Sequence, residues 1–143
     1  MELRIRRIKT TSGYTLSRVF VPNFAELNID LVEPPIEGLA LSPLRTFNPG
    51  IYKLFLKSDA RTCSVLPVFQ RVAQRPRLVI QPFLVQTHPE GIEFVDNERV
   101  RVCVWAGRMQ GECLCPAKEL FDRFVLRLAI AKQQREKITV NIH

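Results

Sequence analysis

Cysteine and histidine are the residue types in this chain that could perform nucleophilic chemistry. Cys103 and His88 lie fifteen residues apart, a spacing that a loop and a strand can bring together. A cysteine nucleophile needs a base to generate the thiolate and backbone N–H groups to hold the oxyanion. One hypothesis is therefore a catalytic pair with Cys103 as nucleophile and His88 as base. The alternative is a buried strand cysteine without reactivity and a histidine in the turn THPEG.

Metal and cofactor chemistry has less support in the residue spacing. Cys113 and Cys115 form a C-x-C pair, whereas structural zinc sites use C-x2-C or wider spacing with a second ligand pair. The chain contains neither of the two glycine-rich phosphate-binding motifs, G-x-x-x-x-G-K-[ST] and G-x-G-x-x-G. We therefore expect no metal site and no cofactor.

The charge balance favours an anionic partner. The chain has 21 Lys and Arg against 14 Asp and Glu, for a net charge of +7. The arginines that could contact such a partner lie in the first hairpin and in the segment QRVAQRPR: Arg4, Arg6, Arg7, Arg71, Arg75 and Arg77. The alternative is a solvated surface. We expect no interleaved exposed aromatic residues, so nucleic acid ranks third among the partners considered.

Length and composition limit the kind of fold that can position these residues. At 143 residues and 46% hydrophobic content, the chain is expected to form a single domain over 1–143. Its opening lacks the apolar run of a signal peptide, and no segment is long and apolar enough for a membrane-spanning helix. We expect reduced thiols and a protein that is made and kept in a cytoplasm, or is assembled there before release.

Alternation of apolar and charged residues predicts a series of strands. In 2–9, Leu3 and Ile5 alternate with Glu2, Arg4 and Arg6. The expected strands are 2–9, 14–21, 24–33, 51–58, 76–86, 99–106 and 137–142. Pro82 should interrupt or bulge the strand that contains it.

One helix is expected, at about 117–133. Its apolar residues recur at helical spacing: Ala117, Leu120, Phe121, Phe124, Leu128 and Ala131. This stripe should pack against the sheet. The expected fold class is α+β: a mostly antiparallel, barrel-like sheet with one long C-terminal helix followed by a final strand.

The order of these segments resembles a family of small phage and bacterial proteins of unknown function. Its members share an opening hairpin, a proline-glycine turn before a strand, a histidine-proline-glycine-asparagine motif, a glycine-cysteine-isoleucine motif and a last helix and strand. The corresponding segments are LRIRRIKTTSGYTLSRVFV, NPGIYKLFLKSD, LPVFQRVAQRPRLVIQPF, VCVWAG and CPAKELFDRFVLRLAIAKQQREKITVNI, which span nearly the whole chain. The family's histidine and cysteine are similar to the arrangement in L,D-transpeptidases, which act on peptidoglycan.

Residue by residue, the resemblance places Cys103 at the family cysteine and Val102 at the preceding glycine. Gln81 stands where the histidine is expected, and a shifted register offers His88-Pro89 instead. An amide cannot act as a base. The resemblance thus implies first a non-enzymatic structural or interaction protein of a phage particle, such as a tail or baseplate component, that joins other virion proteins in an oligomeric assembly. A peptidoglycan-acting enzyme using Cys103 and His88 is the alternative, and a basic nucleic-acid-binding protein is the third.

Overall fold

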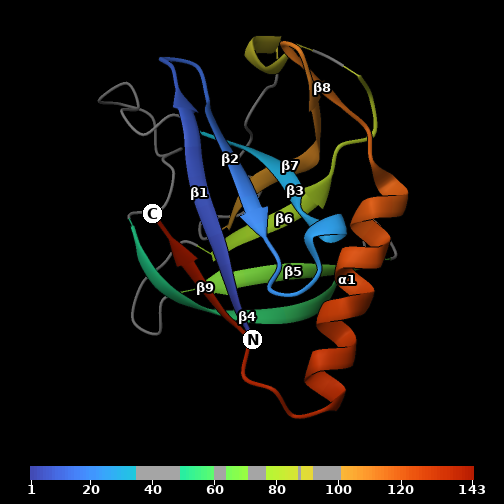
Figure 1. Ribbon diagram of the computed structural model, residues 1–143. Helices are drawn as coiled ribbons and strands as arrows, with labels where there is room; N and C mark the ends of the chain where they lie inside the picture. Colours follow the sequence, from blue (N-terminus) through green and yellow to red (C-terminus); the bar gives the residue numbers. More distant parts are fainter. Residues whose placement is uncertain (35–48, 60–63, 71–76, 87, 92–100) are drawn as a thin grey trace.

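The structure is a computed structural model that describes residues 1–34, 49–59, 64–70, 77–86, 88–91 and 101–143 (Figure 1). At a few of these positions, Cys103 among them, only the backbone is described. The strands are β1 (Glu2–Thr10), β2 (Thr15–Phe20), β3 (Ile29–Glu33), β4 (Gly50–Asp59), β5 (Ser64–Gln70), β6 (Arg77–Pro82), β7 (Arg101–Gln110), β8 (Cys113–Cys115) and β9 (Thr139–Ile142). The helices are α1 (Lys118–Gln133) and two short 3-10 turns, η1 (Ala25–Leu27) and η2 (Pro89–Gly91).

Eight of the strands close into a barrel. Their order is β3-β2-β1-β9-β4-β5-β6-β7, and pairing of β3 with β7 completes the ring. β8 pairs only with the far end of β7 and stands outside the ring. In Figure 1, β1 and β2 cross in front of β4, β5 and β6, and α1 lies along one side. The barrel and the helix followed by a final strand are present as expected.

The fold is mostly β, which corrects the expected α+β class, and its sheet is mixed: most pairings of the ring are antiparallel, as expected, but two are parallel. β9 runs parallel to β1, and β7 runs parallel to β6. The other six pairings of the ring are antiparallel. Strand direction depends on how the chain returns to the sheet, and residue alternation carries no information about that return.

Alternation does determine which residues face the core. Leu3 and Ile5 on β1 are buried, whereas Arg4 and Arg6 between and beyond them are exposed. On β4, Tyr52 and Leu54 are buried. These inward side chains pack in one core with residues from the opposite strands of the barrel. The expected inward faces of both strands are thus confirmed.

Helix α1 buries the predicted stripe. Leu120, Phe121, Phe124, Leu128 and Ala131 are buried, and Ala117 packs against the same core. The helix ends where Arg135 adopts a left-handed conformation, with φ of 59°. The N–H of Glu136 then donates to the carbonyl of Ala131 at 2.9 Å, the bond of a Schellman cap. The chain turns from there into β9.

The expected strands at 24–33 and 76–86 are shorter in the structure, and β5 and β8 were not expected. β6 ends at Pro82, because proline cannot donate to the ladder. β3 is buried on both faces rather than one. A second apolar cluster on its outer side explains this: Tyr14, Val32, Phe83 and Leu114, with Leu16, Trp105 and Met109 packed against it.

Gly107 on β7 allows the end of β8 to approach closely. A Cβ atom at Gly107 would overlap the carbonyl oxygen of Cys115. Only glycine allows the two backbones to approach this closely. The only helix of more than one turn in the described ranges, α1, is not long and apolar enough to cross a membrane.

Candidate binding surface

The outer side of β2, β1, β9 and β4 presents an ordered row of side chains. Phe20 is paired with Arg4, Arg4 with Asn141, and Asn141 with Ile51. Paired residues share a face, so these four side chains stand side by side across four strands. With adjacent strands about 4.8 Å apart, the row spans roughly 14 Å.

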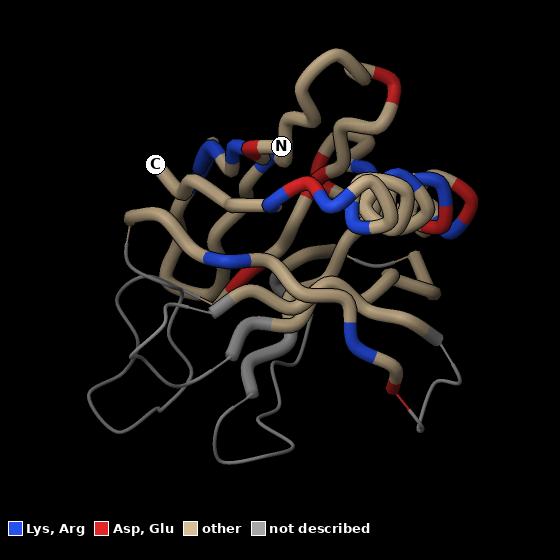
Figure 2. The backbone as a smooth tube through the Cα atoms, turned by 90° about the horizontal axis from the view of Figure 1, so that it is seen from below, with Lys and Arg blue, Asp and Glu red and all other residues tan. Residues whose placement is uncertain are grey.

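The residues around this row are mostly basic. Arg6 pairs with Arg18 on one side of it, and Glu2, Thr139 and Lys53 form the next row on the other. We call this surface the basic face, made of Glu2, Arg4, Arg6, Arg18, Phe20, Ile51, Lys53, Thr139 and Asn141. Figure 2 shows Lys and Arg recurring along β1 and β4, while α1 carries both signs of charge.

Two of the four cations of the basic face have an acidic partner. Arg4 Nε lies 3.6 Å from the carboxylate of Glu2, and Arg18 is paired with Asp30. In the part of the chain that the structure describes, neither Arg6 nor Lys53 forms an ion pair. Arg6 faces the like charge of Arg18 across β1 and β2, which is unfavourable by itself, and the carboxylate of Asp30 offsets this on the Arg18 side.

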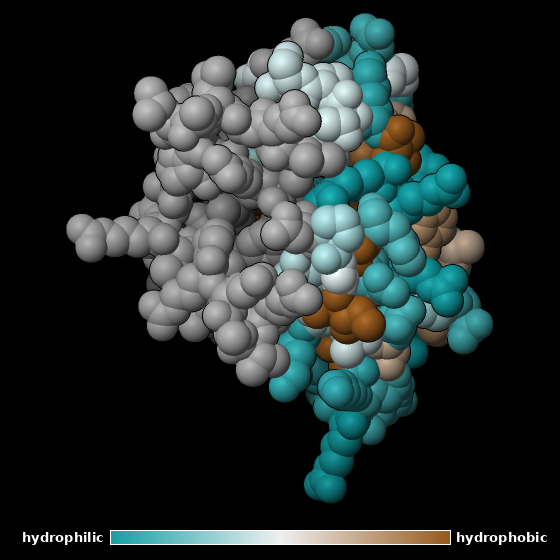
Figure 3. Space-filling view, turned by 90° about the vertical axis from the view of Figure 1, so that its left-hand side faces the viewer, coloured by the Kyte–Doolittle hydropathy of each residue, from teal (hydrophilic) through white to brown (hydrophobic). Residues whose placement is uncertain are grey.

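Large apolar side chains are exposed among these charges. Phe20 is 38% exposed and Ile51 59%, and Phe55, further along the same side of β4, is 44% exposed. This corrects the expectation that the chain lacks exposed aromatics interleaved with its basic residues. In Figure 3, the coloured part of this side of the molecule is hydrophilic, with separate hydrophobic spots within it.

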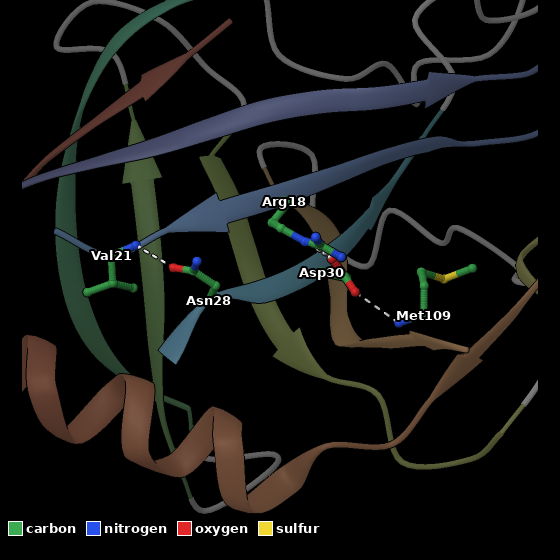
Figure 4. A network of polar contacts seen from close by, with 5 residues as sticks. All are labelled: Arg18, Val21, Asn28, Asp30 and Met109. Carbon is green, nitrogen blue, oxygen red and sulfur yellow. Dashed lines mark hydrogen bonds and ion pairs between the residues drawn. The ribbon is translucent and has the colours of Figure 1, made fainter. Parts of the chain in front are cut away.

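A polar network holds one edge of the basic face. Arg18 Nε donates to Asp30 Oδ1 at 2.7 Å, and the backbone N–H of Met109 donates to Asp30 Oδ2 at 2.9 Å (Figure 4). Nearby, the side-chain oxygen of Asn28 accepts from the N–H of Val21 at 2.9 Å. The hydrogen bond and charge of Asp30 raise the pKa of Arg18. This carboxylate thereby links β2, β3 and β7.

Arg7, one of the arginines expected to meet an anionic partner, points into the barrel. Its Nη2 lies 3.6 Å from Oε2 of Glu33, whose other carboxylate oxygen accepts from Ser17 Oγ at 2.9 Å. The pKa of Glu33 is raised, chiefly by burial, although Arg7 and Ser17 act in the opposite direction. Arg7 is thus occupied by an internal acid and is not part of the basic face.

Of the other five arginines expected to contact an anionic partner, the structure describes the side chains of only some. Arg4 and Arg6 are on the basic face, as their alternation with Leu3 and Ile5 predicts. Arg71 and Arg75 lie outside the described residues, and Arg77 begins β6 with only its backbone described. Two of the six arginines are therefore assigned to the basic face.

The backbone holds Cys103 and His88 at different places. Cys103 pairs with Val79 in the ring portion of β7. His88 Nε2 lies 3.5 Å from Oε2 of Glu112, in the turn beyond the other end of β7. Gln110 lies seven residues after Cys103, on the order of 20 Å along the extended strand. Among the described residues, no three of His, Cys, Asp or Glu gather as a metal site.

Comparison of the chain with protein-family models, curated proteins and solved structures finds no match. The family resemblance therefore stays a prediction. A functional argument therefore depends on the geometry of the structure. The basic face is the feature that best fits a binding site, because its cations and apolar side chains are exposed and lie side by side.

Part of this side of the molecule could be predicted from the sequence. The alternation in β4 already placed Phe55 with Lys53 and Lys57, opposite Tyr52. What the sequence does not contain is the neighbour relation: β9 inserts between β1 and β4, so residues 4, 141 and 51 meet only through the barrel topology.

Proposed function

We propose that this protein is a non-enzymatic binding protein that takes single-stranded nucleic acid on its basic face. The observation that carries the proposal is the row Phe20, Arg4, Asn141 and Ile51, in which an exposed ring, a guanidinium and an amide stand at strand spacing. Sequence-tolerant binders of single strands combine cations that follow the phosphates with aromatic rings on which bases stack. The net charge of +7 supports an anionic partner.

The shape of the surface favours a single strand over a duplex. The basic face is the outer side of a four-stranded section of a barrel, and α1 lies elsewhere. The major groove of a duplex admits a helix or a two-stranded ribbon, and a four-stranded surface is too broad to enter it. A single strand exposes its bases and can lie across the surface with its phosphates on Arg4, Arg6 and Lys53.

The test is the binding of a fluorescein-labelled oligo-dT, measured by fluorescence anisotropy over a salt series. Affinity for a single strand should fall with salt with a slope of about −0.7 per phosphate contacted. The double substitution Arg4→Ala and Arg6→Ala should make that slope shallower by about 1.4 and weaken binding at every salt concentration. Arg123→Ala, an exposed arginine on α1, is the matched control. Equal binding by the double variant and this control would overturn the proposal.

A second candidate is a structural component of a phage particle, as the family resemblance implies. It is supported by an exposed apolar pair after β6, Leu84 at 65% and Val85 at 70% exposure, which suits a contact with another protein. In this proposal the chain co-purifies with intact particles at fixed stoichiometry. Substitution of both residues by serine should release the chain from the particle. Recovery of the wild-type chain only in free lysate would contradict the assignment.

A further inference from the structure

A groove opens beside the basic face, between β4 and the connection from α1 to β9. Its volume is about 380 Å³, within the range of roughly 300–1,000 Å³ typical of small-molecule sites. The lining residues are Lys53, Leu54, Phe55, Lys132, Glu136, Lys137 and Ile138. Lys53 belongs to both surfaces, since it pairs with Thr139 on β9. The groove therefore continues the basic face.

The groove combines amines with an exposed ring. Lys53, Lys132 and Lys137 are all exposed, and they come from three different elements. Its one acid, Glu136, has a carboxylate oxygen 3.5 Å from the amino group of Met1. The groove is therefore net positive. Phe55 is 44% exposed, which leaves part of its ring open to a ligand.

The walls of the groove are fixed by backbone hydrogen bonds. The N–H of Leu54 donates to the carbonyl of Ile138 at 3.2 Å, and that of Thr139 donates to Met1 at 3.0 Å. The cap of α1 fixes Lys132 relative to Glu136 through the bond from Glu136 to Ala131. A wall that is already ordered loses little conformational entropy when a ligand binds.

We propose that this groove is a subsite for one nucleotide unit of the bound strand. The base stacks on the ring of Phe55, and the phosphate lies between Lys132 and Lys137. This inference rests on the proposed function and adds the place where a base, and not only the phosphate backbone, is recognised. Every base has a π-face, so the subsite accepts any base.

The test compares variants of the groove for binding to oligo-dT and to an abasic oligomer of the same length. Phe55→Leu removes the ring and keeps an apolar side chain, whereas Phe55→Tyr keeps the ring. Phe55→Leu should weaken binding to oligo-dT by at least about fivefold and leave binding to the abasic oligomer unchanged. Phe55→Tyr should bind as the wild type does. Thermal melting of each variant establishes that it is folded.

The lysines are tested in the same assay. The double substitution Lys132→Gln and Lys137→Gln should weaken binding to both oligomers and make the salt slope shallower by about 0.7, the value for the one phosphate that lies between these lysines. Lys118→Gln, on the opposite end of α1, is the control. If oligo-dT binds with a steep salt slope but Phe55→Leu matches the wild type, the subsite is wrong and the basic face stands. If neither oligomer binds, or heparin binds equally well, the proposed function falls as well.

Discussion

Arg7 and Glu33 face each other inside the barrel, with 3.6 Å between Nη2 and Oε2. Only 2% of Glu33 is exposed, and Ser17 Oγ donates to it at 2.9 Å. Beside them Thr15 Oγ1 is buried and has no hydrogen-bond partner among the described residues. Among the described residues, the interior of the barrel thus holds a carboxyl group, a guanidinium and two hydroxyls near the ends of β1 and β3.

The pH dependence of stability should carry the signature of Glu33. Because burial raises its pKa, the folded chain holds this proton more tightly than the unfolded chain. The resulting stabilisation is complete below the ordinary Glu pKa of about 4.3 and is lost as pH rises through the raised value. The melting temperature of the wild type should therefore fall relative to that of Glu33→Gln as the pH rises above about 4.3. Glu119→Gln, at an exposed position on α1, should show no such trend.

Phe124 should be among the costliest residues to truncate. It is fully buried where α1 meets the barrel core. Phe124→Ala should lower the free energy of unfolding by roughly 3 to 5 kcal/mol in urea titrations, because it leaves a large cavity. Leu126→Ala removes a side chain that is mostly exposed on the same helix and should cost far less. Similar losses for the two variants would show that the stripe does not pack as described.

Asp30 should stabilise the fold through the hydrogen bonds that its two carboxylate oxygens accept. Asp30→Ala leaves the N–H of Met109 without its acceptor and Arg18 without its carboxylate. An unsatisfied buried donor costs about 1 to 3 kcal/mol. Because the N–H of Met109 is only part-buried and the guanidinium of Arg18 is half-exposed, the loss should lie near the lower end of this range. Asp30→Asn keeps an acceptor and should retain most of the stability. A loss as large for Asn as for Ala would assign the effect to charge rather than to the hydrogen bond.

Arg135 offers a stabilising substitution. Its φ of 59° lies in the left-handed region, which disfavours side chains with a Cβ atom. Arg135→Gly should raise the unfolding free energy by about 1 kcal/mol, since glycine is the preferred residue at this cap position. Glycine at Arg123, within the helix, should lower it by about 1 kcal/mol. A loss of stability in Arg135→Gly would mean that the side chain makes a compensating contact.

Cys103 is predicted to be a structural thiol. Cys103 pairs with Val79 in the ring of the barrel, and the backbone places His88 beyond the far end of β7. Cys103→Ser should leave oligonucleotide binding unchanged, and native Cys103 should react slowly with iodoacetamide by peptide mass spectrometry. Cys113, which is half-buried, provides the comparison within the same chain. Faster labelling of Cys103 than of Cys113 would revive the enzyme hypothesis.

The sequence predicted what depends on neighbours along the chain. Alternation placed Leu3, Ile5 and Tyr52 in the core, and helical spacing placed Phe124 and Leu128 there. These patterns follow from the geometry of a strand and of a helix, whose periods are 2 and 3.6 residues.

The sequence could not predict what depends on pairing. Glu33 lies 26 residues beyond Arg7, and the two meet only because β2 lies between β1 and β3 in a fixed register. β8 is three residues long, too short for any period to appear. The basic face has the same origin, since it joins Arg4 to Ile51 through a strand from the other end of the chain.

The parallel pairing of β1 with β9 also determines how the protein responds to force. Pulling Met1 and His143 apart loads these neighbouring strands lengthwise in opposite directions, so their hydrogen bonds, from Glu2–Thr139 to Ile5–Ile142, resist in shear. Bonds loaded in shear must break together, whereas bonds at the end of a hairpin open one at a time. Forced unfolding depends on the barrier and not on equilibrium stability. The β1–β9 pair is thus a mechanical clamp, and the barrel should give a single high-force rupture when stretched by its ends.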